Sequence, residues 1–139
     1  MADCIFCAIV AGQRQAHLVY DDSHVLAFLD IHPSSRGHAL VIPKQHAETL
    51  KDLPEGEVGP LFLGVKAVMR LLETALRPAG MNIGWNHGWA AGQRVDHLHV
   101  HLIPRYPGDG GGGIQSLTRS FVTEDLAGLA AQIKGAKEP

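Results

Sequence analysis

The stretch from residue 97 to residue 103 reads His-Leu-His-Val-His-Leu-Ile, and it says more about fold and function than any other part of the chain. A β-strand turns successive side chains to opposite faces of its sheet, so His97, His99 and His101 would share one face at intervals of about 6 to 7 Å. The apolar residues that alternate with them would point into a core. The stretch therefore predicts a strand with packing on one face and chemistry on the other.

This row of histidines is open to three interpretations. A half-exposed strand face commonly carries one histidine, but three in strict alternation are much less common. Imidazole is also the commonest ligand of zinc and copper, so the row could hold a catalytic metal ion. Such sites usually recruit a further His or carboxylate, and the nearest carboxylate downstream is Asp109, in a glycine-rich loop. The third interpretation divides the roles, with one histidine as a nucleophile and its neighbours in support.

Outward from this stretch, short apolar runs bounded by polar residues, Gly or Pro indicate a sheet. The expected strands are Leu18–Tyr20, His24–Asp30, His38–Ile42, Met81–Asn86 and Leu98–Ile103. Apolar residues at helical spacing over Val58–Leu76 predict one amphipathic helix packed on that sheet, ended by Pro78 and Gly80. The glycine-rich residues 108–113 are expected to form a mobile loop. A short helix over about 123–134, with Thr123 as its N-cap, is expected at the end.

The bulk properties of the chain fit one globular domain over residues 1–139. A chain of 139 residues can bury about two-thirds of its unfolded surface, and 45% of its residues are hydrophobic. The net charge of −2, without a basic run, argues against a nucleic-acid polymer as partner. No apolar segment approaches the roughly 20 residues that cross a bilayer, so we expect no membrane association and a cytoplasmic location. In a reducing cytosol, Cys4 and Cys7 favour metal or redox chemistry over a disulfide.

The motifs around the histidines resemble those of the histidine triad (HIT) family. The row is preceded by Ala91-Gly-Gln93 and followed by Pro104-Arg105. Further motifs upstream, in the same order as in the family, are Cys4-Ile-Phe-Cys7, Ala27-Phe-Leu-Asp-Ile31, Gly37-His-Ala-Leu-Val-Ile-Pro-Lys-Gln-His46 and Asn82-Ile-Gly-Trp-Asn86. The resemblance covers about residues 4 to 106, and the row with its Pro-Arg is its most specific part.

The resemblance implies a catalytic set built on the triad His97, His99 and His101. The middle histidine, His99, would attack the α-phosphorus of a nucleotide and form a nucleotidyl-histidine that water then cleaves. The phosphate would meet donors from His101, from the Gly92-Gln93 turn and from Asn86. From the residue alone, Asn86 could instead be a turn former before Gly88.

The resemblance also implies a nucleotide site with one departure from the family. Asp30 would accept hydrogen bonds from the ribose hydroxyls, although it could equally open a turn. The apolar slot for a purine base would comprise Phe6, Ile9, Phe28 and Ile31, which could equally be ordinary core residues. Arg94 stands where the family commonly has Ser or Thr, which puts the handling of the leaving group in doubt. Its guanidinium could contact a polyphosphate or simply be solvated.

A structural zinc ion is the cofactor that the resemblance implies. The Cys4-x-x-Cys7 pair alone supplies only two ligands, and two unliganded cysteines remain an alternative. In relatives with this pair, His46 and His97 would complete the set. Such a Cys₂His₂ site has no open position for catalysis.

The implied fold is α+β, a five-stranded antiparallel sheet with one long helix and a short C-terminal helix, in a homodimer that joins two sheets into one. The implied activity is hydrolysis of a nucleoside phosphoramidate or a dinucleoside polyphosphate. Transfer to phosphate by a nucleotidyltransferase or phosphorylase of the same family is one alternative. A non-enzymatic protein that binds a purine nucleotide is the other.

Overall fold

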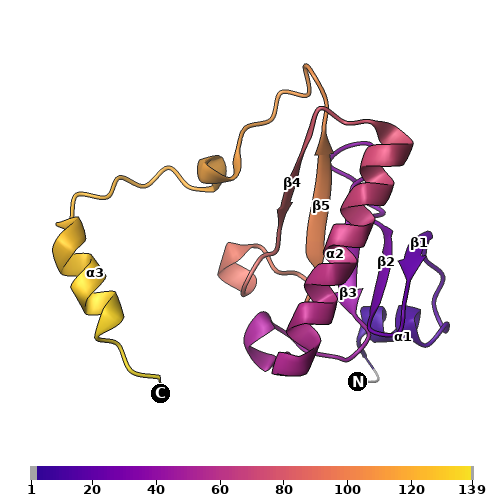
Figure 1. Cartoon of the computed structure of the whole chain (residues 1–139), viewed down its shortest axis with the longest axis horizontal. Coiled ribbons are helices and arrows are strands. Elements are labelled where there is room, and N and C mark those ends of the chain that lie inside the picture. Colours follow the sequence, from indigo (N-terminus) through magenta and orange to yellow (C-terminus); the bar gives the residue numbers. More distant parts are fainter. Residues whose placement is uncertain (1–2, 139) are drawn as a thin grey trace.

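The computed structural model describes residues 3–138 and contains one five-stranded antiparallel sheet (Figure 1). The strand order is β1-β2-β3-β5-β4. The strands are β1 (Leu18–Asp21), β2 (Val25–Leu29), β3 (Ala39–Pro43), β4 (Gly80–Gly84) and β5 (Val100–Arg105). The helices are α1 (Ile5–Val10), α2 (Glu55–Leu76) and α3 (Leu126–Lys134), with short 3₁₀ helices at Leu50–Asp52, Trp89–Ala91 and Ile114–Leu117. This confirms the predicted fold class.

The long helix α2 covers one face of the sheet and forms the main core with it (Figure 1). Val41, Val100 and Leu102 from the sheet are fully buried there, with Leu61 and Val68 from the helix. Helix and sheet approach closely at Gly64, where an added Cβ would lie 2.5 Å from the side chain of Val25. Leu98, Val100 and Leu102 thus point into the core, as the alternation predicts.

The opposite face of the sheet carries a second apolar cluster under the N-terminal helix α1. Phe6 packs there against Phe28 of β2, and the two rings meet edge to face with centroids 5.3 Å apart. Leu40 and Ile42 of β3 complete the buried set. Helix α1 was not predicted, because a six-residue apolar segment shows no periodicity that separates a helix from a strand.

The strands β2, β3 and β4 begin within one residue of the predicted positions, whereas α2 and β5 begin two or three residues away from them. Helix α2 starts at Glu55 instead of Val58, since Pro54 serves as its N-cap and acidic residues fill the first turn. It ends as expected before Pro78, with Arg77 in the left-handed conformation. Strand β5 starts at Val100 instead of Leu98, because its pairing with β3 begins at Val100, which lies opposite Val41. His97 and His99 therefore lie just before the paired part of the strand.

Arg105 connects the glycine-rich segment, which was predicted to be a mobile loop, to the sheet. The guanidinium donates to both carboxylate oxygens of Asp109, at 2.7 and 2.8 Å, and also to the carbonyl of Gly112, at 2.6 Å. It donates as well to the side-chain oxygen of Asn82 on β4, at 2.7 Å. The loop is thus tied to β4 and β5 by one side chain.

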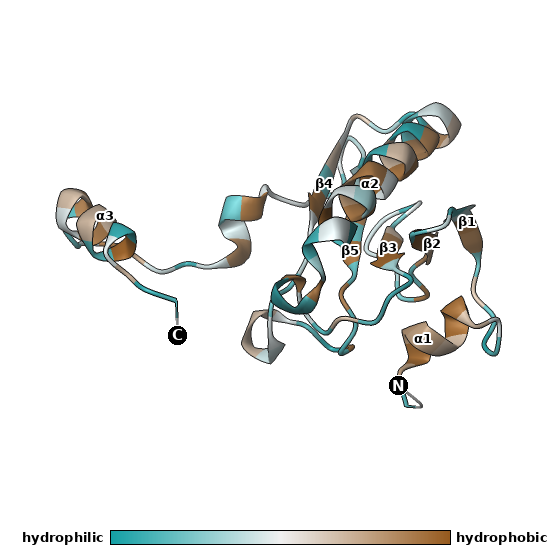
Figure 2. Cartoon of the chain, turned by 60° about the horizontal axis from the view of Figure 1, so that its bottom comes forward, coloured by the Kyte–Doolittle hydropathy of each residue, from teal (hydrophilic) through white to brown (hydrophobic). Residues whose placement is uncertain are grey.

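Beyond this loop the chain forms an arm that leads away from the body to α3 (Figures 1 and 2). Every described residue from 107 to 138 except Leu129 is exposed. The terminal helix was predicted, but Asp125, and not Thr123, caps it, because the Asp125 carboxylate accepts from the amides of Ala127 and Gly128. In the described part of the chain, α2 and the other helices are too short or too polar to span a membrane.

Candidate active site and metal site

His99 lies on the sheet face opposite α2, with one ring nitrogen already committed. Its Nδ1 donates to the carbonyl of His97 at 2.7 Å. The proton is therefore on Nδ1, and Nε2 keeps its lone pair. The edge of the Phe6 ring lies 5.2 Å away between centroids, and the imidazole is about nine-tenths buried. His99 is thus oriented by its Nδ1 hydrogen bond, and its Nε2 is free to act as a nucleophile.

His101 carries its proton on the other nitrogen, and a chain of hydrogen bonds fixes this. The backbone N–H of Ser34 donates to Nδ1 of His38 at 3.0 Å, so neutral His38 carries its proton on Nε2. That Nε2 lies 2.9 Å from Nδ1 of His101 and donates to it. His101 accepts through Nδ1 and therefore presents an Nε2–H.

Burial favours the neutral form of the two hydrogen-bonded histidines, His38 and His101. Desolvation is the main cause that lowers the pKa of His101 to about 4, and the neighbouring His99 and His38 act in the same direction. Desolvation also lowers the pKa of His38, against the attraction of Asp30, whose carboxylate lies 3.5 Å from its Nε2. Asp30, His38 and His101 lie close enough together to hold a metal ion, but the hydrogen bonds already satisfy these histidine nitrogens.

At the other end of the row, Cys4, Cys7, His46 and His97 form a cluster that could bind a metal ion. Their donor atoms all lie within 4.8 Å of one another. Nδ1 of His97 is 3.4 Å from the sulfur of Cys4, and Nδ1 of His46 is 3.2 Å from that of Cys7. Ligands around a tetrahedral zinc ion lie about 3.6 Å apart, so the spacing fits.

The tautomer of His97 also fits a metal ligand. Its Nε2 donates to the carbonyl of Pro43 at 2.8 Å, which leaves the Nδ1 lone pair directed at the sulfur atoms. Burial lowers the pKa of His97 to about 4, so it is neutral. Cys4 also caps α1, since its sulfur accepts from the amide of Cys7 at 3.3 Å. The short helix and the cluster therefore stabilise each other.

Gln93 is buried, and its side-chain amide is used within the protein. Its nitrogen donates to the carbonyls of Glu48 and Val95, at 2.7 and 3.0 Å. Its oxygen accepts from the amide of Gly88 at 2.9 Å. The Gln93 side chain thus braces the turn from Gly88 to Gly92, the turn from which a phosphate donor was expected.

Asn86 lies across that turn from Gly92. Gly92 has a φ of 109°, and an added Cβ would lie 3.2 Å from the Asn86 amide nitrogen, so conformation and space both favour glycine. Arg94 is exposed and stacks on the indole of Trp89 at 4.8 Å, with a hydrogen bond to the Trp89 carbonyl. In this arrangement Arg94 closes its own loop.

The residues expected to form the base slot are divided between core and surface. Phe6 and Phe28 are buried, Ile9 is half-buried, and Ile31 is 72% exposed. Asp30 lies beside His38, where its second oxygen accepts from the amide of His32 at 2.8 Å. Phe6 and Phe28 therefore belong to the second apolar cluster, while Ile31 lies on the surface.

Comparison with known proteins fits this geometry. The sequence profile of the HIT domain matches residues 11–108, which is more than half of the chain. The chain belongs to the HIT family. A HIT family protein from Bacillus subtilis has a crystal structure that matches with a TM-score of 0.85 at 38% identity, over 99% of each chain.

Two further relatives are informative about this HIT protein. A zinc-bound histidine triad family protein from Mycobacterium smegmatis matches with a TM-score of 0.74 at 36% identity, over 98% of this chain and 99% of that one. The adenylylsulfatase HINT3 of Arabidopsis thaliana is 37% identical over 123 residues, which are 88% of this chain and 62% of that protein.

Sequence reasoning missed His38 as a member of the site. His38 stands at the start of a predicted strand, and nothing in the motif Gly37–His46 indicated a hydrogen bond to His101, which lies 63 positions away. The usable signal was strand pairing: Leu40 lies opposite His101 in the register, so a polar residue at the start of the same strand lies near the triad.

Proposed function

We propose that this HIT protein hydrolyses a purine nucleotide conjugate, either a nucleoside phosphoramidate or a dinucleoside polyphosphate. Nε2 of His99 attacks the α-phosphorus and forms a nitrogen–phosphorus bond, while the bond to the leaving group breaks with its electron pair on that group. An amine leaving group takes up a proton from solvent. Water then cleaves the nucleotidyl-histidine, which releases the nucleoside monophosphate and restores His99. The observation that carries this proposal is the Nδ1 bond of His99 to the His97 carbonyl.

The negative charge that develops on the phosphate needs preorganised donors. The Nε2–H of His101 is one, since His38 fixes its tautomer. The Asn86 amide and the backbone of the turn at Gly92 are the others. Gln93 supports these phosphate donors indirectly, because its side chain holds the turn through hydrogen bonds to Gly88 and Glu48.

The nucleoside would bind on the β2 side of His99. The purine lies on the floor formed by Phe6 and Phe28, with Ile9 and Ile31 at its edges, and the Asp30 carboxylate accepts from the ribose hydroxyls. Stacking and buried area favour a large base over a small one. Arg94 borders the same turn as the phosphate donors and is available to a longer phosphate chain once it leaves Trp89.

We further propose a structural zinc ion bound by Cys4, Cys7, His46 and His97. The donor set, its spacing and the His97 tautomer support it, and a relative in the family is zinc-bound. All four positions of a tetrahedral ion are filled, so the ion would fix α1 and the start of β5 and would not activate water. Reduced cysteines that bind zinc are consistent with a cytoplasmic location of the protein.

The protein would act as a homodimer that joins two sheets at β4. This strand is an edge of the sheet, with β5 on one side only. The arm adds exposed apolar side chains that a single copy does not cover, among them Leu117, Phe121, Val122 and Leu126. Exposed apolar surface of this kind typically marks an interface.

Release of adenosine monophosphate from an adenosine phosphoramidate or a diadenosine polyphosphate tests the hydrolase proposal. Wild type is compared with His99→Ala and with His17→Ala, a control at an exposed histidine. We expect His99→Ala to lose activity by about 10⁴-fold while its affinity for the monophosphate stays within about three-fold, and His17→Ala to behave as wild type. Equal activity in His99→Ala would overturn the assignment. Binding without turnover in the wild type would favour the non-enzymatic nucleotide-binding protein, and turnover that requires phosphate would favour the phosphorylase.

A further inference from the structure

The short helix α1 connects the cysteine pair to the nucleophile His99. Cys4 caps this helix and Cys7 lies in its first turn, while Phe6 between them is buried against the sheet. The rings of Phe6 and His99 meet edge to face with centroids 5.2 Å apart, and those of Phe6 and His97 with centroids 6.0 Å apart. A change at the two cysteines therefore reaches the nucleophile through one side chain.

The position of α1 depends on its contacts, because a helix of six residues is too short to be stable alone. One contact is the packing of Phe6 in the apolar cluster on β2 and β3. The other is the cluster of the proposed zinc ligands. The sulfur of Cys4 lies 3.4 Å from Nδ1 of His97. The sulfur of Cys7 lies 3.2 Å from Nδ1 of His46. Without the zinc cluster, Phe6 would be the main anchor of the helix.

The sulfurs of Cys4 and Cys7 are close enough to react with each other. They belong to a group of donor atoms that all lie within 4.8 Å of one another, and both lie within 3.5 Å of Nδ1 of His97. Both cysteines are free and half-buried. Cys-x-x-Cys pairs of this kind form disulfides in redox proteins. A disulfide here would take both sulfurs out of the zinc ligand set.

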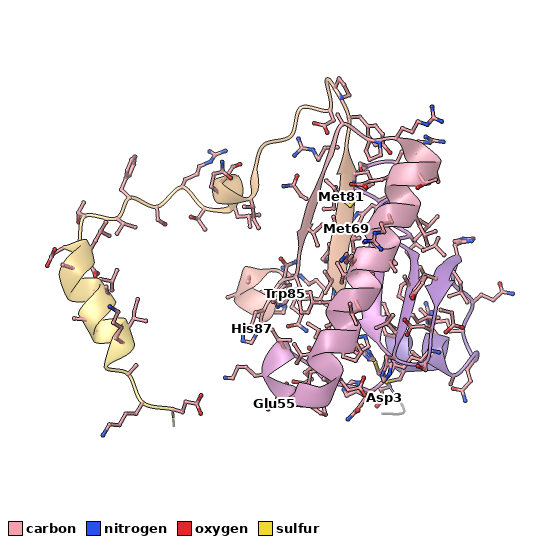
Figure 3. The ribbon with its side chains drawn as sticks, in the orientation of Figure 1. Asp3, Glu55, Met69, Met81, Trp85 and His87 are labelled. Carbon is pink, nitrogen blue, oxygen red and sulfur yellow. The ribbon has the colours of Figure 1, made fainter. Side chains whose placement is uncertain are left out.

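A cleft of about 490 Å³ opens at this cluster. Cys4 and His46 belong to its lining, whereas Cys7 does not. Asp3, which also lines it, lies at the lower edge of the molecule in Figure 3. A small solute in the cleft therefore meets the Cys4 sulfur first, and Cys7 is placed to attack Cys4 from within the helix.

The charges around the cleft favour a small neutral oxidant. Three carboxylates line it, from Asp3, Glu48 and Asp96. Among its described lining residues Arg94 is the one Lys or Arg, and its guanidinium stacks on Trp89. An anionic disulfide such as oxidised glutathione would be repelled by these carboxylates, whereas hydrogen peroxide carries no charge.

We propose that Cys4 and Cys7 form a thiol–disulfide switch that hydrogen peroxide operates, and that its oxidation loosens α1 from the nucleotide site. The Cys4 sulfur bonds to one peroxide oxygen and becomes a sulfenic acid, while the oxygen–oxygen bond breaks and the other oxygen leaves as water. The Cys7 sulfur then attacks the Cys4 sulfur, the sulfur–oxygen bond breaks, and a second water leaves. One peroxide thus takes two electrons from two thiols, and the thiol protons end in the two waters.

The switch rests on the proposed zinc site, and its effect on turnover rests on the proposed hydrolase function. After oxidation only His46 and His97 remain of the four ligands, and two histidines do not complete a tetrahedral site. Helix α1 then keeps only the packing of Phe6. Because Phe6 belongs to the proposed base slot, we expect affinity for the nucleotide to fall about 10-fold, with a rise in KM and little change in kcat.

Oxidation of the zinc-loaded wild type tests the proposal. The protein is treated with a small excess of hydrogen peroxide. Intact mass, zinc released to a chromogenic chelator, and the Kd of adenosine monophosphate are then measured. We expect a mass loss of two hydrogen atoms, release of the zinc, and an increase of about 10-fold in Kd. A reductant with added zinc should restore the affinity. Oxidised methionine adds oxygen, so the mass separates it from the disulfide.

Variants with a single cysteine test the order of attack. With Cys7→Ser, peroxide should leave a sulfenic acid on Cys4 that dimedone traps. With Cys4→Ser, the adduct on Cys7 should form about 10-fold more slowly, because Cys7 does not line the cleft. The affinity of both variants for adenosine monophosphate should not respond to peroxide. Equal rates of trapping would overturn the assignment of the cleft as the route to Cys4.

A further variant tests the charge argument. Asp3→Asn combined with Asp96→Asn should speed disulfide formation by oxidised glutathione by about three-fold and leave the rate with peroxide unchanged. Glu73→Gln, at an exposed acid on α2, is the matched control and should change neither rate. Faster oxidation of the wild type by glutathione disulfide than by peroxide would overturn the choice of oxidant.

A disulfide that leaves the Kd of adenosine monophosphate unchanged, or zinc that stays bound after oxidation, would overturn the switch. Failure of the reduced protein to hydrolyse an adenosine phosphoramidate or a diadenosine polyphosphate would overturn the proposed function instead. The two failures are distinguishable, because the mass, zinc and binding measurements need no turnover.

Discussion

The two ends of the histidine row use the same residue type for different purposes. At one end, Nε2 of His97 donates to the Pro43 carbonyl, so Nδ1 faces the two cysteine sulfurs. At the other end, Nδ1 of His101 accepts from His38, so its Nε2–H is left to donate. The comparison teaches that the partner of one ring nitrogen decides what the other can do. His99 lies between them and differs from both, because its Nδ1 donates to the His97 carbonyl and its Nε2 is free.

The largest effect is expected from breaking the His97 end. Cys7→Ser removes a zinc ligand, and we expect loss of bound zinc and a fall in Tm on the order of 10 °C, because metal binding contributes to folding. The kcat of the folded variant, assayed well below its Tm, should fall by less than about 10-fold. Zinc analysis, calorimetry and the activity assay measure these three quantities. An unchanged Tm, or a loss of kcat as large as that of His99→Ala, would contradict a purely structural metal.

Acid titration should reveal the burial of the His101 end. Its pKa is about 4 in the folded protein and near 6.5 in the unfolded chain. Between these values the unfolded state binds the proton more tightly than the folded state does. The contribution of His101 to the free energy of unfolding is therefore fully present above pH 6.5 and is lost as the pH decreases toward 4. Denaturant unfolding at pH 7.5 and 4.5 should show a smaller decrease in His101→Gln than in wild type, and an equal decrease would argue against this origin.

Loss of the bond that fixes the His101 tautomer should affect activity without affecting the metal. His38→Ala removes the Nε2–H donor, and we expect kcat to fall by about 10- to 100-fold with zinc content unchanged. His38→Gln retains an amide N–H at a similar reach and should recover a large part of this loss. Equal activity in the two variants would mean that His38 acts only through packing.

The smallest effect on chemistry is expected from the arm. Phe121 is 96% exposed in a single copy, and Phe121→Asp should lower the dimer fraction while activity per subunit stays within about two-fold. Light scattering after size-exclusion chromatography measures the dimer. A monomeric wild type at micromolar concentration would remove the basis for this dimer.

The sheet, the long helix and the shared face of the triad could all be predicted, because they depend on periodicity along the chain. Leu98, Val100 and Leu102 alternate with the histidines and do lie in the core. The cluster at Cys4 was reached through family resemblance, since two cysteines alone do not identify the other ligands. Its four side chains lie together in the structure.

What could not be predicted depends on contacts between distant residues. The use of the Gln93 amide on Glu48, and of Arg105 to hold a glycine-rich loop, follows from where the backbone passes in space. The family resemblance implied a phosphate donor in the Gly92-Gln93 turn in the first case, and local composition indicated mobility in the second. Helix α1 was missed for a different reason: its stability comes from Phe6 packing on β2 and from the Cys4 cap.

Covalent capture of the nucleotide tests the central claim most directly. Wild type and His99→Ala are mixed briefly with adenosine 5′-phosphoramidate, quenched, and weighed by intact mass spectrometry, and the adduct is mapped by peptide sequencing. The account predicts an acid-labile addition of one adenosine monophosphate on His99 of the wild type and none on the variant. Turnover without any adduct on a histidine, or an adduct of the same size on His99→Ala, would contradict it.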